Sequence, residues 1–451
     1  MNKRLVSLDA FRGMTIALMI LVNIPGSWSY VYPPFEHADW NGCTPTDLVF
    51  PFFLFIVGVA MAFSFAKYNY RLNAKSLLRV IERTFMIFFV GLILNYYPFF
   101  KDILHSDSFA LNLLDVLKKL ILSLIPFFGF LWIVKKAFSL ANVVTFSNKS
   151  SILKMVYLSL LAVAFVLLIV FLPQLLEYTG FYNKGVSHLR ILGVLQRIAL
   201  AFGFSSLLIL SFDRKYIPYV IAIILFLYWW LMWQFGGDNP FSLEDNFERY
   251  IDLKVLGDNH VWHGKGIPFD PEGLLSTLPS IGTPLLGYLV GRYIKENKNA
   301  FGTWFYKIVG FGVLLILLGQ LWNVVFPINK SLWTSSYVLY TAGLATVVLM
   351  AFYWLIDIKK HKTWSNFFIV FGINPLFAFV VHVLWVKILL YIIRWENATG
   401  KIENGYGWLF KNVFQPLAGN MNGSFLFAIT HIFFFWLMLY VLYKKKIIIK
   451  L

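Results

Sequence analysis

The chain has 451 residues, of which 59% are hydrophobic and 19% aromatic, and its formal net charge is +17 at pH 7. One soluble core of this length could not bury so much apolar surface, and much of that surface occurs in blocks of about 20 residues, the length that spans a bilayer. These numbers exclude an ordinary soluble globular protein and predict an all-α, polytopic bundle of membrane helices.

Twelve apolar segments are expected to cross the membrane, or eleven if the fourth and weakest does not. In chain order they cover residues 10–25, 47–67, 79–98, 119–134, 154–174, 192–211, 216–235, 274–294, 304–326, 334–356, 367–394 and 424–443. One hydrophilic stretch, at about 237–273, is rich in acidic and turn-forming residues. We therefore expect a single transmembrane domain over residues 1–451 with one sizeable loop.

Charged residues divide between alternate loops, with lysine and arginine in one set and most of the acids in the other. Because cytoplasmic loops are the ones rich in Lys and Arg, both termini are expected in the cytoplasm and residues 237–273 on the opposite side. The net charge is thus a topology signal, and no nucleic acid partner is expected. Lys118 and Lys119 conflict with this pattern, since they fall at the outer end of the weak fourth segment.

Several common kinds of site are not indicated. The first apolar run ends at residues 23–26 without a small-x-small cleavage pattern, so we expect it to stay as the first membrane helix. Cys43 is the only cysteine, which excludes an intrachain disulfide and a cysteine metal cluster. His260 and His263 lack a convincing third ligand, so no metal is predicted. Nucleophile-elbow, Walker A and glycine-fingerprint motifs are absent.

The connection between the first two apolar segments holds the clearest candidates for catalytic residues in the chain. His37 lies there among Glu36, Asp39 and Asp47, and an imidazole beside carboxylates is suited to proton transfer near neutral pH. It could act as a general base or as a nucleophile, or it could cap the second helix or pack beside Trp40. Asp47 could orient the imidazole or simply N-cap that helix.

Polar side chains also occur inside the apolar segments, where a charged residue costs roughly 2.5–3.5 kcal/mol on insertion scales. Any one of them could be explained by a hydrogen bond between helices. As a set they predict a polar cavity within the bundle: Asn23, Gln196, Arg197, Asn323, Asn374, His382 and Lys387.

Seven short sequences follow one another along the chain: SLDAFRG at 7–13, HADWNG at 37–42, TDLVFPFFLFIVG at 46–58, RILGVLQR at 190–197, DPEGLL at 270–275, LWTSSYVLYTAG at 332–343 and VFGINPLFAFVVH at 370–382. This ordered set resembles the transmembrane N-acetyltransferases typified by heparan-α-glucosaminide N-acetyltransferase and its bacterial relatives. The resemblance implies transfer of acetyl from cytosolic acetyl-CoA to the amino group of a glucosamine-type sugar on the far side of the membrane.

The resemblance also implies roles for particular residues. The family's catalytic histidine falls on His37, and its upstream asparagine falls on Asn23, where an amide could polarise the thioester carbonyl or hold the acceptor. Asp39, Trp40, Asn41 and Asp47 would support His37. The remaining motif positions are Arg190, Gln196, Arg197, Asp270, Glu272, Trp333, Ser335, Asn374 and His382.

Aminolysis of a thioester needs a base for the amine proton and donors facing the developing oxyanion. His37 is expected to be the base and Asn23 a donor. Direct transfer in a ternary complex is the simpler hypothesis, and a route through an acetyl-histidine stays open. Coenzyme A is anionic, so its nucleotide end is expected to meet Arg12, Arg71 and Arg79 on the cytoplasmic side.

Residues 99–190 are longer than the family pattern, and we expect no luminal N-terminal domain of the kind that animal lysosomal enzymes carry. The longer segment leaves the acceptor open, whereas a bare bundle with a short cytoplasmic start favours a bacterial inner-membrane protein. A homodimer is an open expectation. Two alternatives remain from the sequence: an O-acyltransferase acting on an envelope glycan, and a transporter of an amino sugar.

Overall fold

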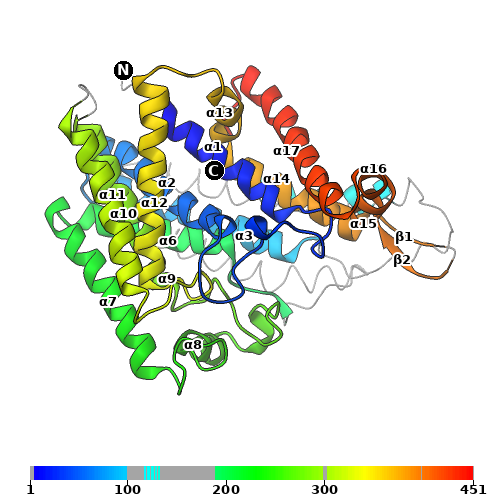
Figure 1. Ribbon diagram of the computed structural model, residues 1–451, viewed down its shortest axis with the longest axis horizontal. Helices are drawn as coiled ribbons and strands as arrows, with labels where there is room; N and C mark the ends of the chain where they lie inside the picture. The colour runs from blue at the N-terminus through cyan, green and yellow to red at the C-terminus, as the bar shows by residue number, and fades with distance from the viewer. Residues whose placement is uncertain are drawn as a thin grey trace, which may run out of the picture.

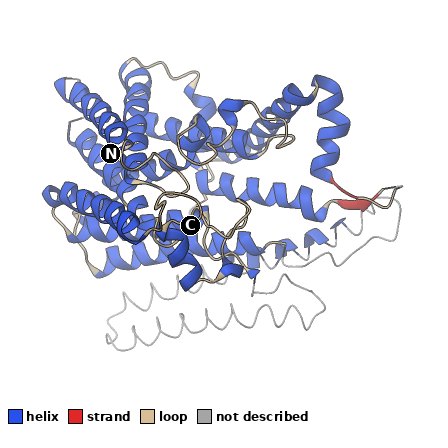
Figure 2. Ribbon diagram, turned by 60° about the horizontal axis from the view of Figure 1, so that its bottom comes forward, coloured by secondary structure: helices blue, strands red, loops and turns tan. Residues whose placement is uncertain are grey.

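The computed structural model describes residues 5–98, 116–132 without 118, 122, 126 and 130, 188–297, 302–397 and 399–449. The expected segment at 154–174 lies outside the described residues, as does part of 119–134. The structure is helical, with one small antiparallel pair of strands among the described residues, β1 (Arg394–Glu396) and β2 (Ile402–Asn404), at the edge of the molecule in Figure 2.

Eight helical segments in the described part of the chain are long and apolar enough to cross a membrane. They are Val6–Asn23, Pro45–Tyr68, Val194–Ser211, Arg214–Phe235, Thr303–Trp322, Ser335–Ile358, Pro375–Ile392 and Asn420–Lys444. In the labels of Figure 1 they contain α1 (Val6–Asn23), α2 (Val49–Ser64), α6 (Val194–Ser211), α7 (Ile217–Phe235), α11 (Thr303–Trp322), α12 (Ser335–Phe352), α14 (Pro375–Lys387) and α17 (Asn420–Lys444). An α-helical membrane protein is therefore confirmed, whereas the count of twelve spans is not.

Two further expected segments form helices that are not both long and apolar enough to count among these eight. The segment at 79–98 corresponds to α3 (Ala74–Tyr96), whose first half carries Lys75, Arg79, Glu82 and Arg83. The segment at 274–294 begins with a turn and the short α9 (Thr277–Ser280), so its main helix is the 16-residue α10 (Gly282–Asn297).

The expected continuous span at 367–394 is broken in two. The short α13 (Ser365–Ile373) ends at Asn374, whose backbone leaves the helical region at φ −124° and ψ 55°, and α14 begins at Pro375. Proline lacks the N–H that would continue the helix and disfavours helical backbone in the preceding residue. The continuous apolar run concealed this break.

The helices pack through glycines that bring backbones into contact. The tightest pairs are α1 with α13, α2 with α10, α3 with α6, and α11 with α12. A Cβ at Gly13 would lie 1.7 Å from the carbonyl oxygen of Phe368, and one at Gly372 would lie 2.0 Å from that of Asp9. Small residues at such crossings allow the close van der Waals packing that holds helices together in lipid.

The remaining elements occupy the ends of the bundle. Outside the helices already given, 3-10 turns cover Pro33–Phe35 (η1), Pro45–Leu48 (η2), Phe65–Tyr68 (η3), Arg214–Tyr216 (η5) and Asp258–His260 (η6), and π-helical turns cover Tyr353–Ile358 (η7), Ile388–Ile392 (η8) and Phe410–Phe414 (η9). The short helices are α8 (Phe247–Val255), α15 (Gly405–Leu409) and α16 (Gln415–Ala418). In Figure 1, α8 and α9 lie at the lower end of the bundle.

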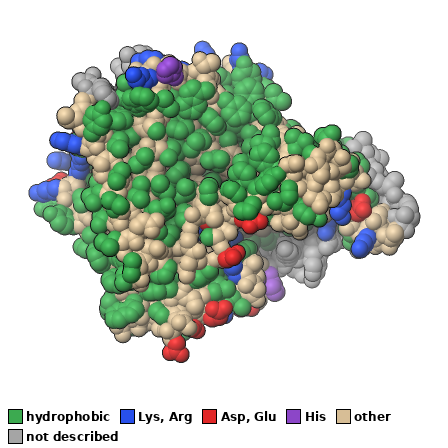
Figure 3. Space-filling model, in the orientation of Figure 1, with side chains coloured by type: hydrophobic (Ala, Val, Ile, Leu, Met, Phe, Trp, Pro, Cys, Tyr) green, Lys and Arg blue, Asp and Glu red, His purple; other side chains and the backbone are tan. Residues whose placement is uncertain are grey.

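The surface charge is asymmetric along the bundle. On the face shown in Figure 3, Lys and Arg gather toward the upper end and the upper left edge, Asp and Glu gather at the lower end near α8, and a smaller mixed group of both charges lies on the right-hand lobe. Hydrophobic side chains cover most of the surface between them. A belt of this kind between two polar ends suits a protein surrounded by lipid.

Candidate active site

The candidate site is built on the connection between α1 and α2. Thr44 and Asp47 form a capping box at η2, with Pro45 at its first position. The Asp47 Oδ2 atom accepts hydrogen bonds from the backbone N–H groups of Thr44 at 3.0 Å and Ala38 at 3.1 Å. These bonds fold the loop back on itself, which brings His37 beside the other carboxylate oxygen.

The His37 Nδ1 atom lies 2.6 Å from Asp47 Oδ1. Asp47 is only 1% exposed and its carboxylate already accepts backbone hydrogen bonds, so Nδ1–H is the donor and Asp47 the acceptor. The lone pair of the imidazole is then on Nε2, and the side chain is 46% exposed. Asp47 therefore both caps the helix and orients the imidazole, so the two sequence alternatives for it are compatible.

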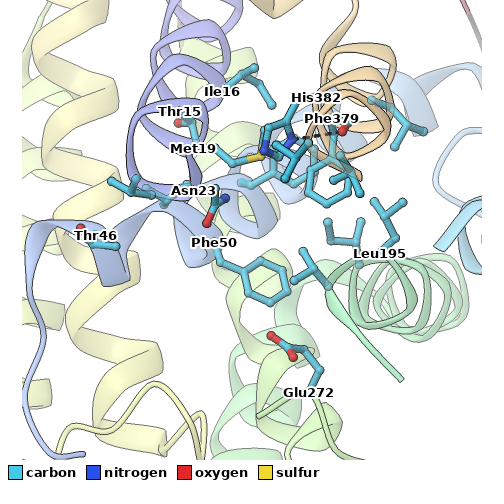
Figure 4. Close-up of a pocket in the computed structure, with 18 of the residues that line it drawn as sticks. Thr15, Ile16, Met19, Asn23, Thr46, Phe50, Leu195, Glu272, Phe379 and His382 are labelled. Atoms are coloured by element: carbon cyan, nitrogen blue, oxygen red, sulfur yellow. Dashed lines mark hydrogen bonds between the residues drawn. The ribbon is translucent and has the colours of Figure 1, made fainter. Parts of the chain in front are cut away.

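His37 lines a cavity of about 470 Å³. Asn23, at the C-terminal end of α1, and His382, on α14, line the same cavity, together with Glu272 from the end of the long loop. In the view of Figure 4, Asn23 lies between His382 above and Glu272 below. Most of the remaining wall is apolar: Ile16, Met19, Val22, Val49, Phe50, Phe53, Val194, Leu195, Ile198, Leu376, Phe379, Val383, Val386 and Leu390.

Lys330 is a member of this site that the sequence analysis missed. Its Nζ lies 3.0 Å from His37 Nδ1, 3.5 Å from His37 Nε2 and 3.4 Å from Asp47 Oδ1. Burial lowers the pKa of Lys330, while the charges of Asp47 and Glu272 act in the opposite direction. The sequence feature that could have identified Lys330 is its position two residues before the LWTSSYVLYTAG segment.

The backbone at Lys330 is fixed by its neighbour Asn329. The Asn329 side chain accepts from the Leu332 N–H at 2.9 Å and donates to Asn41 Oδ1 at 3.2 Å. The backbone N–H of Gly42 also donates to the Ile328 carbonyl at 2.7 Å. The loop that carries His37 and the loop that carries Lys330 are thus joined directly.

Arg190 holds the two carboxylates of the DPEGLL segment. Its Nε and Nη2 donate to the two oxygens of Asp270 at 2.8 and 2.6 Å, and Nη2 also donates to Glu272. Burial acts to lower the pKa of Arg190, but the two carboxylates outweigh it and raise the pKa above the usual value. Asp270 is fully buried, so within this triad Glu272 is the member that reaches the cavity.

Four other predicted positions support the site from behind and do not line the cavity. Arg197 is fully buried, donates to the Gly273 carbonyl at 3.1 Å and lies 5.4 Å from the Trp333 ring centroid. Ser335 donates to the Leu225 carbonyl at 2.7 Å. Gln196 is also buried, and its side-chain oxygen lies against Gly91.

Two buried acids, Glu248 and Asp252 on α8, were also missed. Burial raises the pKa of Glu248 well above its usual value, and burial raises that of Asp252 to about 7. A Cβ at Gly273 would lie 1.9 Å from Asp252 Oδ2 and 2.7 Å from Glu248 Oε1, so only glycine fits there. The spacing of four residues, which places both carboxylates on one helix face, was the available signal.

Asn374 and His382, the two residues that the resemblance implies in the expected span at 367–394, are separated by the break. His382 faces the cavity, and its Nδ1 lies 3.2 Å from the Phe379 carbonyl. Asn374 does not line the cavity: it donates to the Ile447 carbonyl at 3.0 Å and accepts from the Ile449 N–H at 2.9 Å. It ties the end of α13 to the chain after α17.

The neighbours of His37 in HADWNG mainly attach the loop. Trp40 donates to the Phe241 carbonyl at 2.8 Å and packs against Phe269 with ring centroids 5.5 Å apart. Asp39 is exposed, and its backbone carbonyl accepts from Lys265 at 2.6 Å. Residues 237–273 therefore lie against the loop that carries His37.

The three arginines expected to bind coenzyme A lie far from this loop. Arg12 contacts Asp9 at 3.2 Å and is about 16 Å along α1 from Asn23, since the two are eleven residues apart at 1.5 Å per residue. Arg79 pairs with Glu82 at 2.9 Å near the start of α3, and Arg71 is exposed just before that helix. None of the three lines the cavity.

The geometry supports a definite kind of chemistry. An imidazole oriented by a buried carboxylate can accept a proton at Nε2, and amide and ammonium donors stand at the same cavity. Among the described residues no group of three or more His, Cys, Asp or Glu side chains could hold a metal ion. The oriented imidazole and the apolar wall of the cavity suit acid–base chemistry on a ligand with an apolar arm.

Comparison with known proteins gives two related sequences. No protein-family model matches the chain. Heparan-α-glucosaminide N-acetyltransferase from Mus musculus is 26% identical across 99% of this chain, and the one from Homo sapiens is 24% identical across 99%. The aligned region is 60% of the length of each relative. The similarity therefore supports a relationship to N-acetyltransferases over nearly the whole of this chain.

Proposed function

We propose that this protein is a membrane-embedded acetyltransferase that moves the acetyl group of acetyl-CoA to the amino group of a glucosamine-type sugar. The observation that carries the proposal is the His37–Asp47 pair, at 2.6 Å, on the wall of a cavity shared with Asn23. The names of the two related sequences supply the reaction class and the acceptor type. His37, Asp47 and Asn23 are the residues that carry the chemistry.

His37 is the general base of this reaction. The neutral amine attacks the thioester carbonyl, Nε2 takes the amine proton, and Asp47 stabilises the imidazolium through Nδ1. Asn23 donates to the carbonyl oxygen, and the proton passes from His37 to the departing coenzyme A sulfur. A well-placed base of this kind contributes about 10²–10⁴-fold.

The donor and acceptor approach from opposite ends of the bundle. The basic end, with Arg12, Arg71 and Arg79, faces the cytoplasm and receives the nucleotide of coenzyme A, while the uncharged arm carries the thioester toward Asn23. The charge asymmetry in Figure 3 supports this orientation, since Lys and Arg mark the cytoplasmic side. The acceptor enters beside Glu272 from the extracytoplasmic side, and the membrane is a bacterial inner membrane.

The orientation is tested by cysteine labelling. Burial raises the pKa of the native Cys43 thiol to about 12, so it is a slow reporter. In a Cys43→Ser background, an exposed cysteine at Asn259→Cys should react with an impermeant maleimide in intact cells, and one at Lys360→Cys only in inverted vesicles. The reverse pattern would overturn the orientation.

The reaction is tested in proteoliposomes loaded with acetyl-CoA and supplied with glucosamine. Wild-type protein should form N-acetylglucosamine, and His37→Gln should lose this activity while remaining folded. His263→Gln is the matched control, because His263 is an exposed loop histidine that contacts Asp258 and not the cavity. An ester product in place of an amide would indicate an O-acyltransferase, and uptake of unmodified sugar without acetyl-CoA would indicate a transporter.

A further inference from the structure

Lys330 is a charged group at the reaction centre with no part in the steps described so far. It stands 3.5 Å from the nitrogen that acts as base, and its side chain is 24% exposed. The backbone that carries it is fixed by Asn329, Asn41 and Gly42, which belong to the two joined loops. Such a fixed ammonium beside the base is suited to an electrostatic role.

We propose that Lys330 is a catalytic residue whose ammonium group binds the carbonyl oxygen of the acetyl group and stabilises the negative charge that develops on it. The inference rests on the proposed acetyltransferase function. It adds a cationic donor to the neutral amide of Asn23. A full charge is the stronger of the two, because hydrogen bonds to ionised groups are roughly twice as strong as neutral ones.

The distances allow this placement. An attacking nitrogen that donates to His37 Nε2 lies about 3 Å from it. The carbonyl oxygen is two bonds from that nitrogen once the new C–N bond forms. Lys330 Nζ is 3.5 Å from Nε2 and 3.0 Å from Nδ1, so the oxygen can lie within hydrogen-bond reach of the ammonium when the amine approaches from the lysine side of the ring.

The step balances with this residue in place. The nitrogen lone pair forms the C–N bond, and the π electrons of the carbonyl move to its oxygen, where Lys330 holds the charge. His37 takes the proton from nitrogen. As the carbonyl re-forms, the C–S bond breaks with its electron pair on sulfur, and His37 returns the proton to that sulfur.

The neighbouring carboxylates stabilise the charged form of Lys330 and leave its ammonium group able to bind a further oxygen. Asp47 Oδ1 lies 3.4 Å from Lys330 Nζ, and that same oxygen already accepts the shorter bond from His37. Glu272 is shared with Arg190 and is a second negative charge near Lys330. Both carboxylates favour the protonated form of the lysine.

The first test is substitution of the charge. Lys330→Met should lower kcat for acetyl transfer by about 10²–10³-fold, the usual effect of removing one oxyanion donor, with KM values changed only a few-fold. Lys330→Arg should retain a substantial part of kcat. Because arginine cannot carry an acetyl group, its activity also separates charge stabilisation from a lysine acyl carrier.

Lys265→Met is the matched control, since Lys265 is a lysine held by the same loop, through the Asp39 carbonyl, without contact to His37. It should keep wild-type kcat. A kcat for Lys330→Met within threefold of wild type would overturn the inference. So would a loss confined to KM, which indicates only ground-state binding.

Restoring the ammonium group by chemical modification distinguishes an electrostatic role of Lys330 from a structural one. The native chain has one cysteine, so a Cys43→Ser, Lys330→Cys variant presents one thiol. Alkylation with 2-bromoethylamine places an ammonium at the reach of lysine and should restore kcat at least tenfold, whereas iodoacetamide should not. Equal activity after the two reagents would contradict the proposal.

The proposed function and the role of Lys330 are contradicted by different results. If wild-type protein forms no acetylated product, the proposed function fails. If wild type is active and His37→Gln is inactive, but Lys330→Met stays near wild type, the role of Lys330 alone is wrong.

Discussion

The two sides of the cavity are built in different ways. On the loop side, His37, Asp47 and Lys330 are fixed by side-chain and backbone hydrogen bonds within and between two loops. On the helix side, α1 and α14 present mostly apolar side chains, and their polar members are Thr15, Asn23, His382 and Lys387. The loop side fixes the positions of the ionisable groups, and the helix side determines the shape of the cavity.

This difference has an energetic consequence. Each buried polar group on the loop side has several partners, so removing one leaves the others unsatisfied, at about 1–3 kcal/mol for each neutral group. A change on the helix side removes contacts without leaving a charge unpaired. Substitutions on the two sides should therefore differ in size and in kind.

The largest effect is expected at His37. His37→Gln should lower kcat by about 10²–10⁴-fold, because the base is lost while the polar character of the loop is kept. Turnover measured under saturating acetyl-CoA checks this. A loss seen only at low acceptor concentration would place His37 in binding instead.

Within the His37–Asp47 pair, Asp47→Asn is expected to have the second largest effect, at about 10²-fold in kcat, together with a loss of roughly 1 kcal/mol in stability. The amide cannot accept from His37 as strongly, and the cap at η2 is weakened. Thr44→Ala removes part of the cap without touching His37. If Thr44→Ala lowers kcat as much as Asp47→Asn does, the carboxylate has no separate role in orienting the imidazole.

The pH dependence of stability tests the buried acids on α8, which lie behind the loop side of the cavity. The native pKa of Asp252, about 7, is above its ordinary value of 3.8, so the native state binds the extra proton and stability should fall as pH rises from about 4 to 7. Asp252→Asn should reduce this slope by up to about 1.4 kcal/mol per pH unit. Thermal unfolding in detergent across this range checks the slope, with the exposed Asp258→Asn as control.

Asn23→Ala, on the helix side, should lower kcat by about tenfold, less than the usual loss for an oxyanion donor, because the Lys330 ammonium still stabilises the oxygen. One neutral hydrogen bond is worth roughly 0.5–1.5 kcal/mol, and 1.4 kcal/mol corresponds to a factor of ten in rate. Steady-state kinetics with both substrates varied would show it. A loss as large as that of His37→Gln would mean that the helix side takes part in the proton transfer.

The smallest effect is expected for His382→Gln, at about threefold or less. The hydrogen bond of His382 goes to the Phe379 carbonyl of its own helix, so its loss should cost no more than a polar contact between membrane helices, which is worth about 0.6 kcal/mol on average. The same kinetic measurements give this value. A change in the pH profile of kcat would show instead that His382 exchanges protons with the reactants.

Hydropathy predicted the helices well because lipid imposes a simple rule on composition. It could not show the break at Asn374 and Pro375, since the residues on both sides are apolar and a proline within a membrane helix has several outcomes. Likewise, the sequence singled out His37 and Asn23, which the fold brings to one cavity. Their catalytic roles stay predictions.

Lys330, Glu248 and Asp252 were missed for a different reason. Each lies in a hydrophilic loop, where charged residues are common and are usually solvated. Their burial depends on how residues 237–273 and the segment before α12 fold against the His37 loop, which involves contacts hundreds of residues apart in the chain. No local pattern records such contacts.

The tie between Asn374 and residues 447–449 has a practical consequence for handling the protein. The two hydrogen bonds of its amide hold the last described residues against the point where α13 gives way to α14. An affinity tag fused directly after these residues would be expected to strain the two hydrogen bonds of Asn374 when the tag is bound to a resin. A tag separated by a flexible spacer, compared with one fused directly, would show whether enzyme preparations owe differences in activity to the placement of the tag.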